Sequence, residues 1–217
     1  MSESEHRLNI DWRGRERYAK TWDHQLALHS ARREGTALDT LVLVEHEPVI
    51  TLGRQGDEAN LLLNDEMLEK HGVDFHRVER GGDITFHGPG QLVGYPVLSL
   101  RQLGITVRDL MRNLEEALIR TVAEYGIEAG RIEGLTGVWH GDQKLAALGV
   151  AVKGGVSFHG FALNVDTDLS YFQMIVPCGI TGKEVASIST VLGRKITLDD
   201  IRPKVEHHIR EVFGYGG

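Results

Sequence analysis

The chain has 217 residues, of which 41% are hydrophobic and 25% charged, and 24 basic against 31 acidic residues give a net charge of −7. These values predict one globular domain over residues 1–217 and argue against disorder and against a nucleic-acid-binding protein, which normally carries a basic footprint. The single cysteine, Cys178, excludes an intramolecular disulfide and a zinc site with two thiolates. The polar N-terminus and the absence of an apolar run of ~20 residues lead us to expect a cytoplasmic protein without membrane contact.

The first half of the chain predicts one helix and several strands. Residues 15–33 are expected to form a helix that ends before Gly35, with one stripe made of Tyr18, Trp22, Leu26 and His29. Residues 41–52 predict two strands broken by Pro48, and residues 73–79 predict another. A glycine-rich loop over 81–90 surrounds a short extended piece, and a strand is expected over 95–100.

The second half predicts a long helix, three hairpin strands and two capped helices. The helix covers 107–125 behind Thr106 and Asp109, and the strands cover 135–140, 143–152 and 156–164. A capping box over 181–184 is expected to open a helix that runs to about Leu192, and a second box over 197–200 opens the last helix. Consecutive hairpins and grouped helices predict an α+β fold with a mixed, largely antiparallel sheet and packed helices.

Two residues are candidates for nucleophilic chemistry. Cys178 follows an apolar run and Pro177 and precedes the predicted capping box, so it suits a thiolate held at a helix N-terminus. A lone cysteine is also commonly a small buried hydrophobe. Lys144 opens the apolar strand LAALGVAV, where it is either partly desolvated or solvated at a strand end. The local sequence leaves both pairs of alternatives open.

The histidines and glycines give no sign of a bound cofactor. There are 11 histidines, but no HExxH motif, and the adjacent His207 and His208 are expected at the surface of a charged helix. The 81–90 loop matches neither a P-loop nor a GxGxxG fingerprint. We therefore expect neither a metal nor a cofactor.

Four ordered motifs and one early segment resemble a known family. The motifs are RGGDITFHGPGQ (80–91), KLAALG (144–149), SFHGFALN (157–164) and PCG (177–179), and the segment is EHEPVITLG (45–53). Together they are similar to the lipoyl(octanoyl)transferases over about residues 40–192. Phe86 stands where many relatives have Tyr and Val176 where Asn is common, while Asp83 occupies a variable position.

The resemblance implies a fold, a reaction and two protein partners. The fold is the catalytic domain shared with biotin- and lipoate-protein ligases. The reaction moves an octanoyl group from octanoyl-acyl carrier protein to a lysine of lipoyl domains, in 2-oxoacid dehydrogenases and the glycine-cleavage carrier protein. This is the first step of endogenous lipoate synthesis on protein. No nucleic acid and no membrane is implied as a partner.

The resemblance also implies the site residues. Cys178 would form the acyl-thioester intermediate and Lys144 would be its partner. The substrate-binding residues would be Arg80, Gly81, Gly82, Asp83, Ile84, Thr85, Phe86, His87, Ala147, Leu148, Gly149, Gly160, Phe161 and Ala162. Whether His87 and His159 assist proton transfer or only hydrogen-bond the site is open.

Three other functions compete with this interpretation. They are an ATP-dependent lipoate- or biotin-protein ligase, a transferase that starts from an octanoyl-protein, and a non-catalytic acyl-binding module. Since the chain is acidic overall, contact with acidic partner proteins would require a local basic patch, for which Arg80, Lys153 and Arg194-Lys195 are candidates.

Overall fold

The computed structural model describes residues 7–176 and 183–216, so Cys178 lies outside the described residues. In chain order, its helices and strands are β1 (Leu8–Glu16), α1 (Tyr18–Arg33), β2 (Asp39–His46), β3 (Val49–Leu52), α2 (Asp65–His71), β4 (Asp74–Arg77), β5 (Ile84–His87), β6 (Gln91–Val97), α3 (Leu100–Leu103), α4 (Val107–Ala123), β7 (Gly130–Ile132), β8 (Leu135–His140), β9 (Gln143–Lys153), β10 (Val156–Asn164), β11 (Glu184–Val185), α5 (Ile188–Leu192) and α6 (Leu198–Phe213). Short 3-10 helices, η2 and η3, cover Glu58–Asn60 and Leu169–Met174.

The main sheet is mixed, and most of its neighbouring strands are antiparallel. Among the described residues its strand order is β1-β2-β6-β10-β9-β8-β7, and β11 pairs with the start of β9. Only β1 with β2 and β11 with β9 run parallel. This confirms the predicted α+β class and its largely antiparallel sheet.

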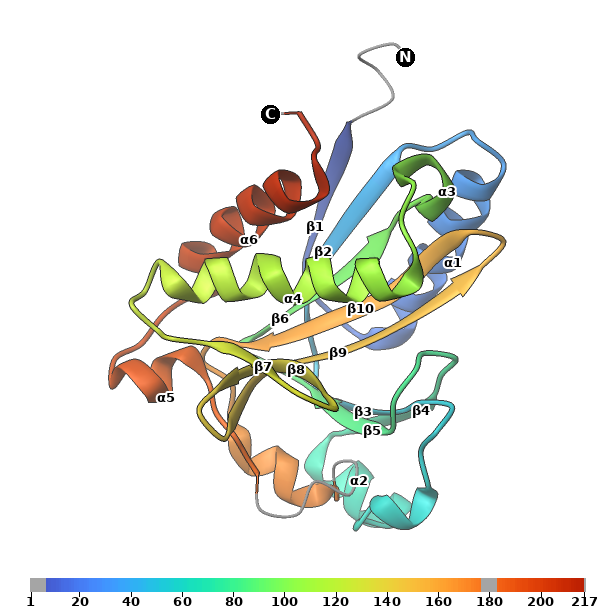
Figure 1. The fold of residues 1–217 in the computed structure, drawn as a ribbon. Coiled ribbons are helices and arrows are strands. Elements are labelled where there is room, and N and C mark those ends of the chain that lie inside the picture. The colour runs from blue at the N-terminus through green and yellow to red at the C-terminus, as the bar shows by residue number, and fades with distance from the viewer. Residues whose placement is uncertain (1–6, 177–182, 217) are drawn as a thin grey trace.

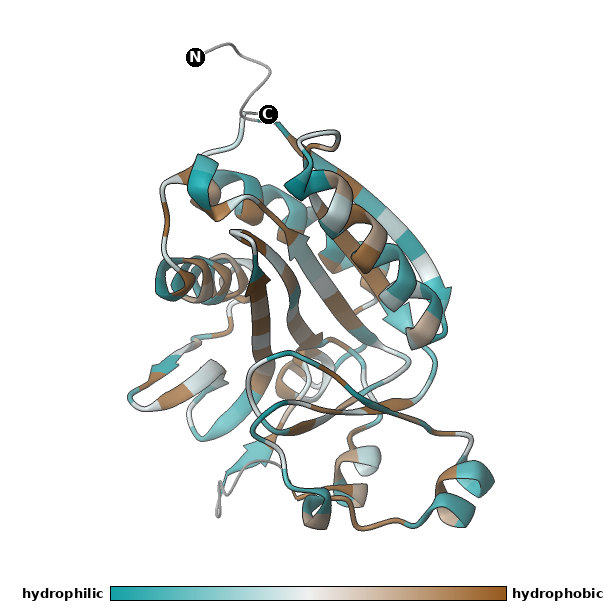
Figure 2. Cartoon of the chain, turned by 90° about the vertical axis from the view of Figure 1, so that its right-hand side faces the viewer, coloured by the Kyte–Doolittle hydropathy of each residue, from teal (hydrophilic) through white to brown (hydrophobic). Residues whose placement is uncertain are grey.

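Helices cover both faces of the main sheet. Helices α4 and α6 pack against each other and against one face, where the largest apolar cluster lies (Figure 1). Helix α1 covers the other face, where Tyr18 packs with Val42, Val93 and Ala162. Figure 2 shows the apolar strands between helices whose outer surfaces are hydrophilic. Burial of these faces from water is the main stabilising contribution to the fold.

A second sheet lies beside the α1-covered face of the main sheet. Its order is β4-β3-β5, and it packs on α2 and η3 through a separate apolar cluster that includes Ile50, Leu68 and Phe86. The segment between β4 and β5 leaves this sheet and reaches β9, where the Gly81 N–H donates to the Val150 carbonyl at 3.0 Å. The two sheets are therefore joined at the segment that carries the glycine-rich motif.

Several predicted boundaries are confirmed. The break at Pro48 separates β2 from β3, and β8, β9 and β10 follow the three predicted hairpin strands. Thr106 and Thr197 form capping boxes with Asp109 and Asp200, as their spacing predicts.

Other predictions are wrong in ways that have a physical cause. Residues 15 and 16 belong to β1, a parallel edge strand that the sequence analysis missed, and α1 begins at Tyr18. Its buried line runs through Thr21 and Gln25, while Leu26 is exposed. The helix expected from the 181–184 box begins only at Ile188, because Glu184 pairs in β11 and Ser187 caps α5. In the part of the chain that is described, no helix combines the length and apolarity needed to cross a bilayer.

We predict that Gly160→Ala destabilises the protein by at least about 2 kcal/mol, because a Cβ there would lie 2.1 Å from the Gly94 carbonyl oxygen of β6. Gly130→Ala is the matched control, since a Cβ at this strand position meets no atom within 4 Å. Urea unfolding of both variants would measure the difference. Equal free energies of unfolding for the two would contradict the assigned β6–β10 packing.

Candidate active site

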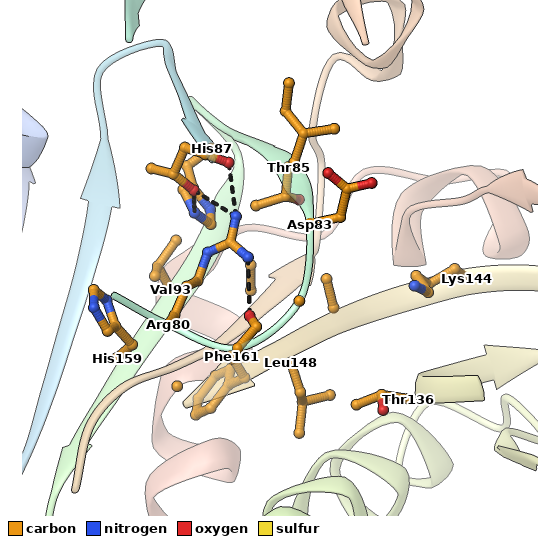
Figure 3. A pocket seen from close by; sticks show the side chains of 18 of the residues that line it. Arg80, Asp83, Thr85, His87, Val93, Thr136, Lys144, Leu148, His159 and Phe161 are labelled. Carbon is orange, nitrogen blue, oxygen red and sulfur yellow. Dashed lines mark hydrogen bonds between the residues drawn. The ribbon is translucent and has the colours of Figure 1, made fainter. Parts of the chain in front are cut away.

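The described residues form a large cavity, of about 550 Å³, between β9, β10 and the segment that carries the glycine-rich motif. Its walls combine apolar side chains, such as Leu148 and Phe161, with a few polar groups, which is typical of a small-molecule site. Figure 3 shows Lys144 and His159 at opposite sides of the view, with Arg80 and Leu148 between them.

Lys144 lies half-buried at the start of β9, where its side chain lines the cavity. Its Nζ is 4.8 Å from the ring centroid of Trp139 on the neighbouring strand β8, a cation–π distance that favours an ammonium group. On the other side of β9, Val185 of β11 is its strand partner, and the Ala186 N–H donates to the Lys144 carbonyl at 3.0 Å. Two neighbouring strands thus fix the backbone of Lys144.

The Arg80 side chain lies in the cavity wall, where hydrogen bonds from its guanidinium group hold it in place. Its Nη2 donates to the Thr51 carbonyl and hydroxyl at 2.7 and 2.9 Å, and its Nη1 donates to the Gly81 carbonyl at 3.1 Å. A Cβ at Gly149 would lie 2.7 Å from the Gly81 carbonyl oxygen, so glycine at 149 lets the Arg80 segment touch β9.

A buried polar chain continues from Arg80 and fixes the tautomer of His87. The Gln91 amide nitrogen donates to the Phe86 carbonyl and to Asn164 Oδ1, so Gln91 Oε1 accepts, and His87 Nδ1 at 2.8 Å must be its donor. The Thr51 hydroxyl then donates to His87 Nε2, 3.4 Å away, while it accepts from Arg80. Burial lowers the pKa of His87 to about 3, so the ring is neutral.

His159 lies far from Lys144. It pairs across the hairpin with Val150, six residues beyond Lys144, which is about 20 Å along a strand at roughly 3.3 Å per residue. Its backbone has φ of 57°, the one positive value at a described residue other than glycine, and its ring stacks on Trp22 with centroids 4.6 Å apart. Direct proton transfer between His159 and Lys144 does not fit this placement.

His159 is also neutral and leaves one polar atom unpaired. Burial lowers its pKa to about 3, and the cations Arg80 and Arg54 lower it further. Its Nε2 has no hydrogen-bond partner among the described residues, although the side chain is almost fully buried.

The residues expected to bind substrate converge on the cavity, with one exception. Arg80–Thr85, His87, Ala147–Gly149 and Gly160–Ala162 all line it. Phe86 does not, because alternation along β5 turns its ring to the opposite side, where it stacks on Tyr171 of η3 at 4.6 Å. A tyrosine at position 86 would therefore place its hydroxyl in the packing behind β5 and outside the cavity.

The predicted nucleophile is not placed by the structure, since Cys178 is outside the described residues. The described chain resumes at Lys183, which lines the cavity, and Val185 pairs with Lys144. Val185 follows Cys178 by seven positions in the sequence.

Sequence reasoning missed several residues of the site. Thr51 and Gln91 position Arg80 and His87, Asn164 extends the chain of hydrogen bonds to the Ala186 carbonyl, and Trp139 contacts Lys144. Gln91 and Asn164 stand at the ends of two of the quoted motifs, which was an available signal. Thr51 lies within the quoted segment 45–53, whereas Trp139 lies in a strand whose local pattern indicates only burial.

A single group of side chains in the described residues could hold a metal ion. His207, His208 and Glu211 of α6 place ligand atoms within 4.8 Å of one another. The nitrogens of His208 already contact Glu124 Oε1 at 2.7 Å and Glu211 Oε2 at 3.3 Å. These contacts are part of a surface network that links Glu124, at the end of α4, to α6.

We predict that the free energy of unfolding falls as the pH drops from 7 to 5. Burial lowers the pKa of His46 to about 4 and those of His87 and His159 to about 3, whereas an unfolded histidine titrates near 6.5. The unfolded chain therefore binds more protons below pH 6.5, so stability is complete above that pH and is lost on acidification. At pH 5 the loss is about 2 kcal/mol for each fully neutral ring.

Urea unfolding at pH 7 and pH 5 measures this loss. His46→Gln should reduce the difference between the two pH values, while His71→Gln, at an exposed position on α2, should leave it unchanged. A free energy of unfolding that does not depend on pH over this range would refute the assignment of buried, neutral rings.

Known proteins resemble the chain in both sequence and fold. The model of the lipoyl protein ligase A/B catalytic domain matches residues 17–210. An octanoyltransferase of Solibacter usitatus is 52% identical over 93% of this chain and 91% of its own, and one of Alkaliphilus metalliredigens is 46% identical over 96% of each.

Solved structures show the same fold at low identity. A lipoate-protein ligase A bound with ATP superposes with a TM-score of 0.74 at 18% identity, over 97% of this chain and 86% of its own. A biotin protein ligase from Aquifex aeolicus gives 0.53 at 11% identity, over 96% and 70%. The predicted likeness to ligase catalytic domains is thus confirmed. The sequence comparisons are closer, and the chain belongs to the lipoyl protein ligase A/B catalytic domain family and, within it, to the octanoyltransferases, which are acyltransferases.

Proposed function

We propose that the chain, as one catalytic domain over 1–217, transfers an octanoyl group from octanoyl-acyl carrier protein to a lysine of lipoyl domains. The acceptors are the lipoyl domains of 2-oxoacid dehydrogenases and the glycine-cleavage carrier protein, in the cytoplasm. The observation that carries this proposal is the position of Lys144 at a largely apolar cavity, in a chain 52% identical to an octanoyltransferase.

In the first half-reaction, the Cys178 thiolate attacks the carbonyl carbon of the donor thioester. A new carbon–sulfur bond forms, the bond to the carrier sulfur breaks, and the carrier leaves as a thiol after taking up a proton. One thioester replaces another, so the step is nearly isoenergetic. A covalent intermediate also lets the donor leave before the acceptor arrives.

Lys144 stabilises the thiolate as an ammonium in the resting enzyme. Its cation–π contact with Trp139 supports this charged form over a neutral amine. The position of Val185 beside Lys144 supports the pairing, because only six residues lie between Cys178 and Val185. An ammonium next to a thiol favours the nucleophilic, deprotonated sulfur.

In the second half-reaction, the acceptor lysine amine attacks the enzyme thioester. The carbon–nitrogen bond forms, the carbon–sulfur bond to Cys178 breaks, and the amine gives up a proton as the amide forms. Lys144, after passing its own proton to the departing carrier thiolate, is a neutral amine and can take this proton as a general base. His159 has no part in this transfer because of its distance from Lys144.

The octanoyl tail occupies the cavity along β9 and β10. Ala147, Gly149 and Ala162 leave space there, and Leu148 and Phe161 add apolar surface. Burial of about seven methylene-sized units at ~0.8 kcal/mol each contributes at most about 5–6 kcal/mol, which is enough to favour eight carbons over short chains.

The test is the intact mass of the protein after mixing with octanoyl-acyl carrier protein, without ATP or acceptor. We expect one hydroxylamine-labile octanoyl adduct, which is absent in Cys178→Ala and forms at least about a hundredfold more slowly in Lys144→Ala. Lys70→Ala, at an exposed position on α2, is the control and should form the adduct at the wild-type rate.

Other results identify the competing functions. Modification of a lipoyl domain that requires ATP and free octanoate, with no adduct, would make the chain an adenylating ligase. Adduct formation from an octanoyl-protein but not from octanoyl-acyl carrier protein would identify the octanoyl-protein as the donor. No adduct and no transfer under any of these conditions would leave an acyl-binding module.

A further inference from the structure

A short antiparallel ladder holds the chain ahead of the proposed nucleophile. It is formed by residues 60–62 and 174–176, and in it the Val176 N–H donates to the Asn60 carbonyl at 2.8 Å. The side chain of Ile175, in the middle of the ladder, is buried in the apolar cluster of the second sheet. The backbone is therefore fixed as far as Val176, two residues before the nucleophile.

The side chain of Asn60 ties this ladder to the glycine-rich motif. Its Nδ2 donates to Asp83 Oδ2 at 2.7 Å. Because a carboxylate only accepts hydrogen bonds, the amide nitrogen of Asn60 must be the atom that faces Asp83. The backbone of Asp83 is itself held, since its carbonyl accepts from the Gly53 N–H at 3.0 Å. One side-chain contact thus connects residues 174–176 to the segment that forms the cavity wall.

The carboxylate oxygens of Asp83 are turned away from the space for substrate, although the residue borders the cavity. Oδ2 accepts from Asn60, while Oδ1 is buried, receives no hydrogen bond from a described residue and lies 2.7 Å from the position of a Cβ at Gly56. Figure 3 shows the carboxylate directed away from Leu148 and Phe161 in the apolar wall. Direct contact of this carboxylate with substrate does not fit this placement.

The chain that follows the nucleophile is anchored to the other sheet. Val185 pairs with Lys144 of the main sheet, whereas the ladder and Asp83 adjoin the second sheet. The position of Cys178 relative to Lys144 therefore depends on both anchors. Two residues span at most about 7 Å between Cα atoms, so a shift of Val176 is passed on to Cys178.

We propose that Asp83 is a positioning residue that acts through Asn60 and does not bind substrate. By holding Val176, this pair sets the place of the Cys178 thiol relative to the Lys144 ammonium. The inference rests on the proposed function, in which Cys178 forms the acyl-enzyme, and adds the contact that orients the nucleophile from the second sheet. Misplacement of a reacting group by about 1 Å can cost about a hundredfold in rate, so such a contact matters for catalysis.

An exchange of the two side chains tests this contact. Asn60→Asp places two carboxylates face to face, and at pH 8 their repulsion should break the link. Adding Asp83→Asn to this variant restores one donor and one acceptor, with the hydrogen bond reversed and the total charge of the wild type. Asp83→Asn alone keeps an amide oxygen that can accept from Asn60. Asn9→Asp, at an exposed position on β1, is the matched control for the added charge.

The first readout is the rate of octanoyl adduct formation at increasing concentrations of octanoyl-acyl carrier protein. Asn60→Asp should lower the maximal rate at least about tenfold and change the half-saturating donor concentration by less than about twofold. The double variant should recover to within about threefold of the wild-type rate. Asp83→Asn alone and Asn9→Asp should both behave as the wild-type protein does.

Alkylation of Cys178 by iodoacetamide gives a second readout, which a loss of stability alone would not move. An ammonium favours the thiolate only when the two groups are close. The midpoint of the pH profile of alkylation should therefore rise in Asn60→Asp and return to the wild-type value in the double variant.

Contrary outcomes separate this inference from the proposed function. Wild-type protein that forms no octanoyl adduct overturns the proposed function and this inference with it. If the wild type forms the adduct, a wild-type rate in Asn60→Asp, or a slow rate that the exchange does not rescue, overturns the inference alone. A raised half-saturating donor concentration in Asp83→Asn would assign the carboxylate to substrate and likewise overturns it. If Asn60→Asp does not fold, the double variant decides, since a folded protein with the expected rate supports the inference and an unfolded or slow one overturns it.

Discussion

The contact between the Arg80 segment and β9 is the constraint on which the site depends. The hydrogen bond from the Gly81 N–H to the Val150 carbonyl joins the small sheet to the main sheet, and the cavity exists because the segment bridges them there. The bridge requires glycine at position 149, because a Cβ there would lie 2.7 Å from the Gly81 carbonyl oxygen. It also requires that Arg80 keep its guanidinium on Thr51. Packing and hydrogen bonding thus fix a charged group beside an otherwise apolar wall.

The polar chain behind Arg80 makes this arrangement rigid without adding charge. Thr51, His87, Gln91 and Asn164 satisfy one another in a fixed order, in which each donor finds one acceptor. Because burial keeps His87 neutral, Arg80 is not opposed by a second cation behind it. Such satisfied buried networks cost little free energy of folding and specify one geometry. Loss of one hydrogen bond would leave a buried polar group without a partner.

Local signals in the sequence predicted elements well when a single residue decides the outcome. Pro48 ends β2, and Thr106 caps α4 through Asp109, because both effects act within one turn of the chain. The helix expected from the 181–184 box begins later than predicted, because Glu184 pairs with β9 and Ser187 forms a capping box with Thr190, while Thr181 and Gly182 lie outside the described residues. Pairing between strands that are distant in the sequence cannot be recognised from a local sequence pattern. The strand β1 was missed for the same reason, since its sequence LNIDWRGRE is polar and only its pairing with β2 makes it a strand.

The candidate site was predictable as a set of motifs but not as a geometry. The motif residues converge on one cavity, yet strand alternation removes Phe86 from it, and the hairpin register puts His159 about 20 Å from Lys144. A positive φ at His159 turns its ring toward Trp22, beside that of Phe158, against the alternation of the strand. Neither effect follows from residue type. Arg80 and Lys153, both candidates for a basic patch, also separate, since Arg80 is buried while Lys153 is exposed.

The shared fold does not by itself separate an acyl transfer from an ATP-dependent ligation. At 18% identity the likeness to a lipoate-protein ligase A bound with ATP concerns the backbone alone. What this chain adds to that backbone includes Lys144 at the start of β9, placed between two strands and against Trp139. We therefore expect the reaction to depend on the residues that the cavity brings to Lys144, and the proposed nucleophile Cys178, seven positions before the strand partner of Lys144, is the residue that would separate the two reactions.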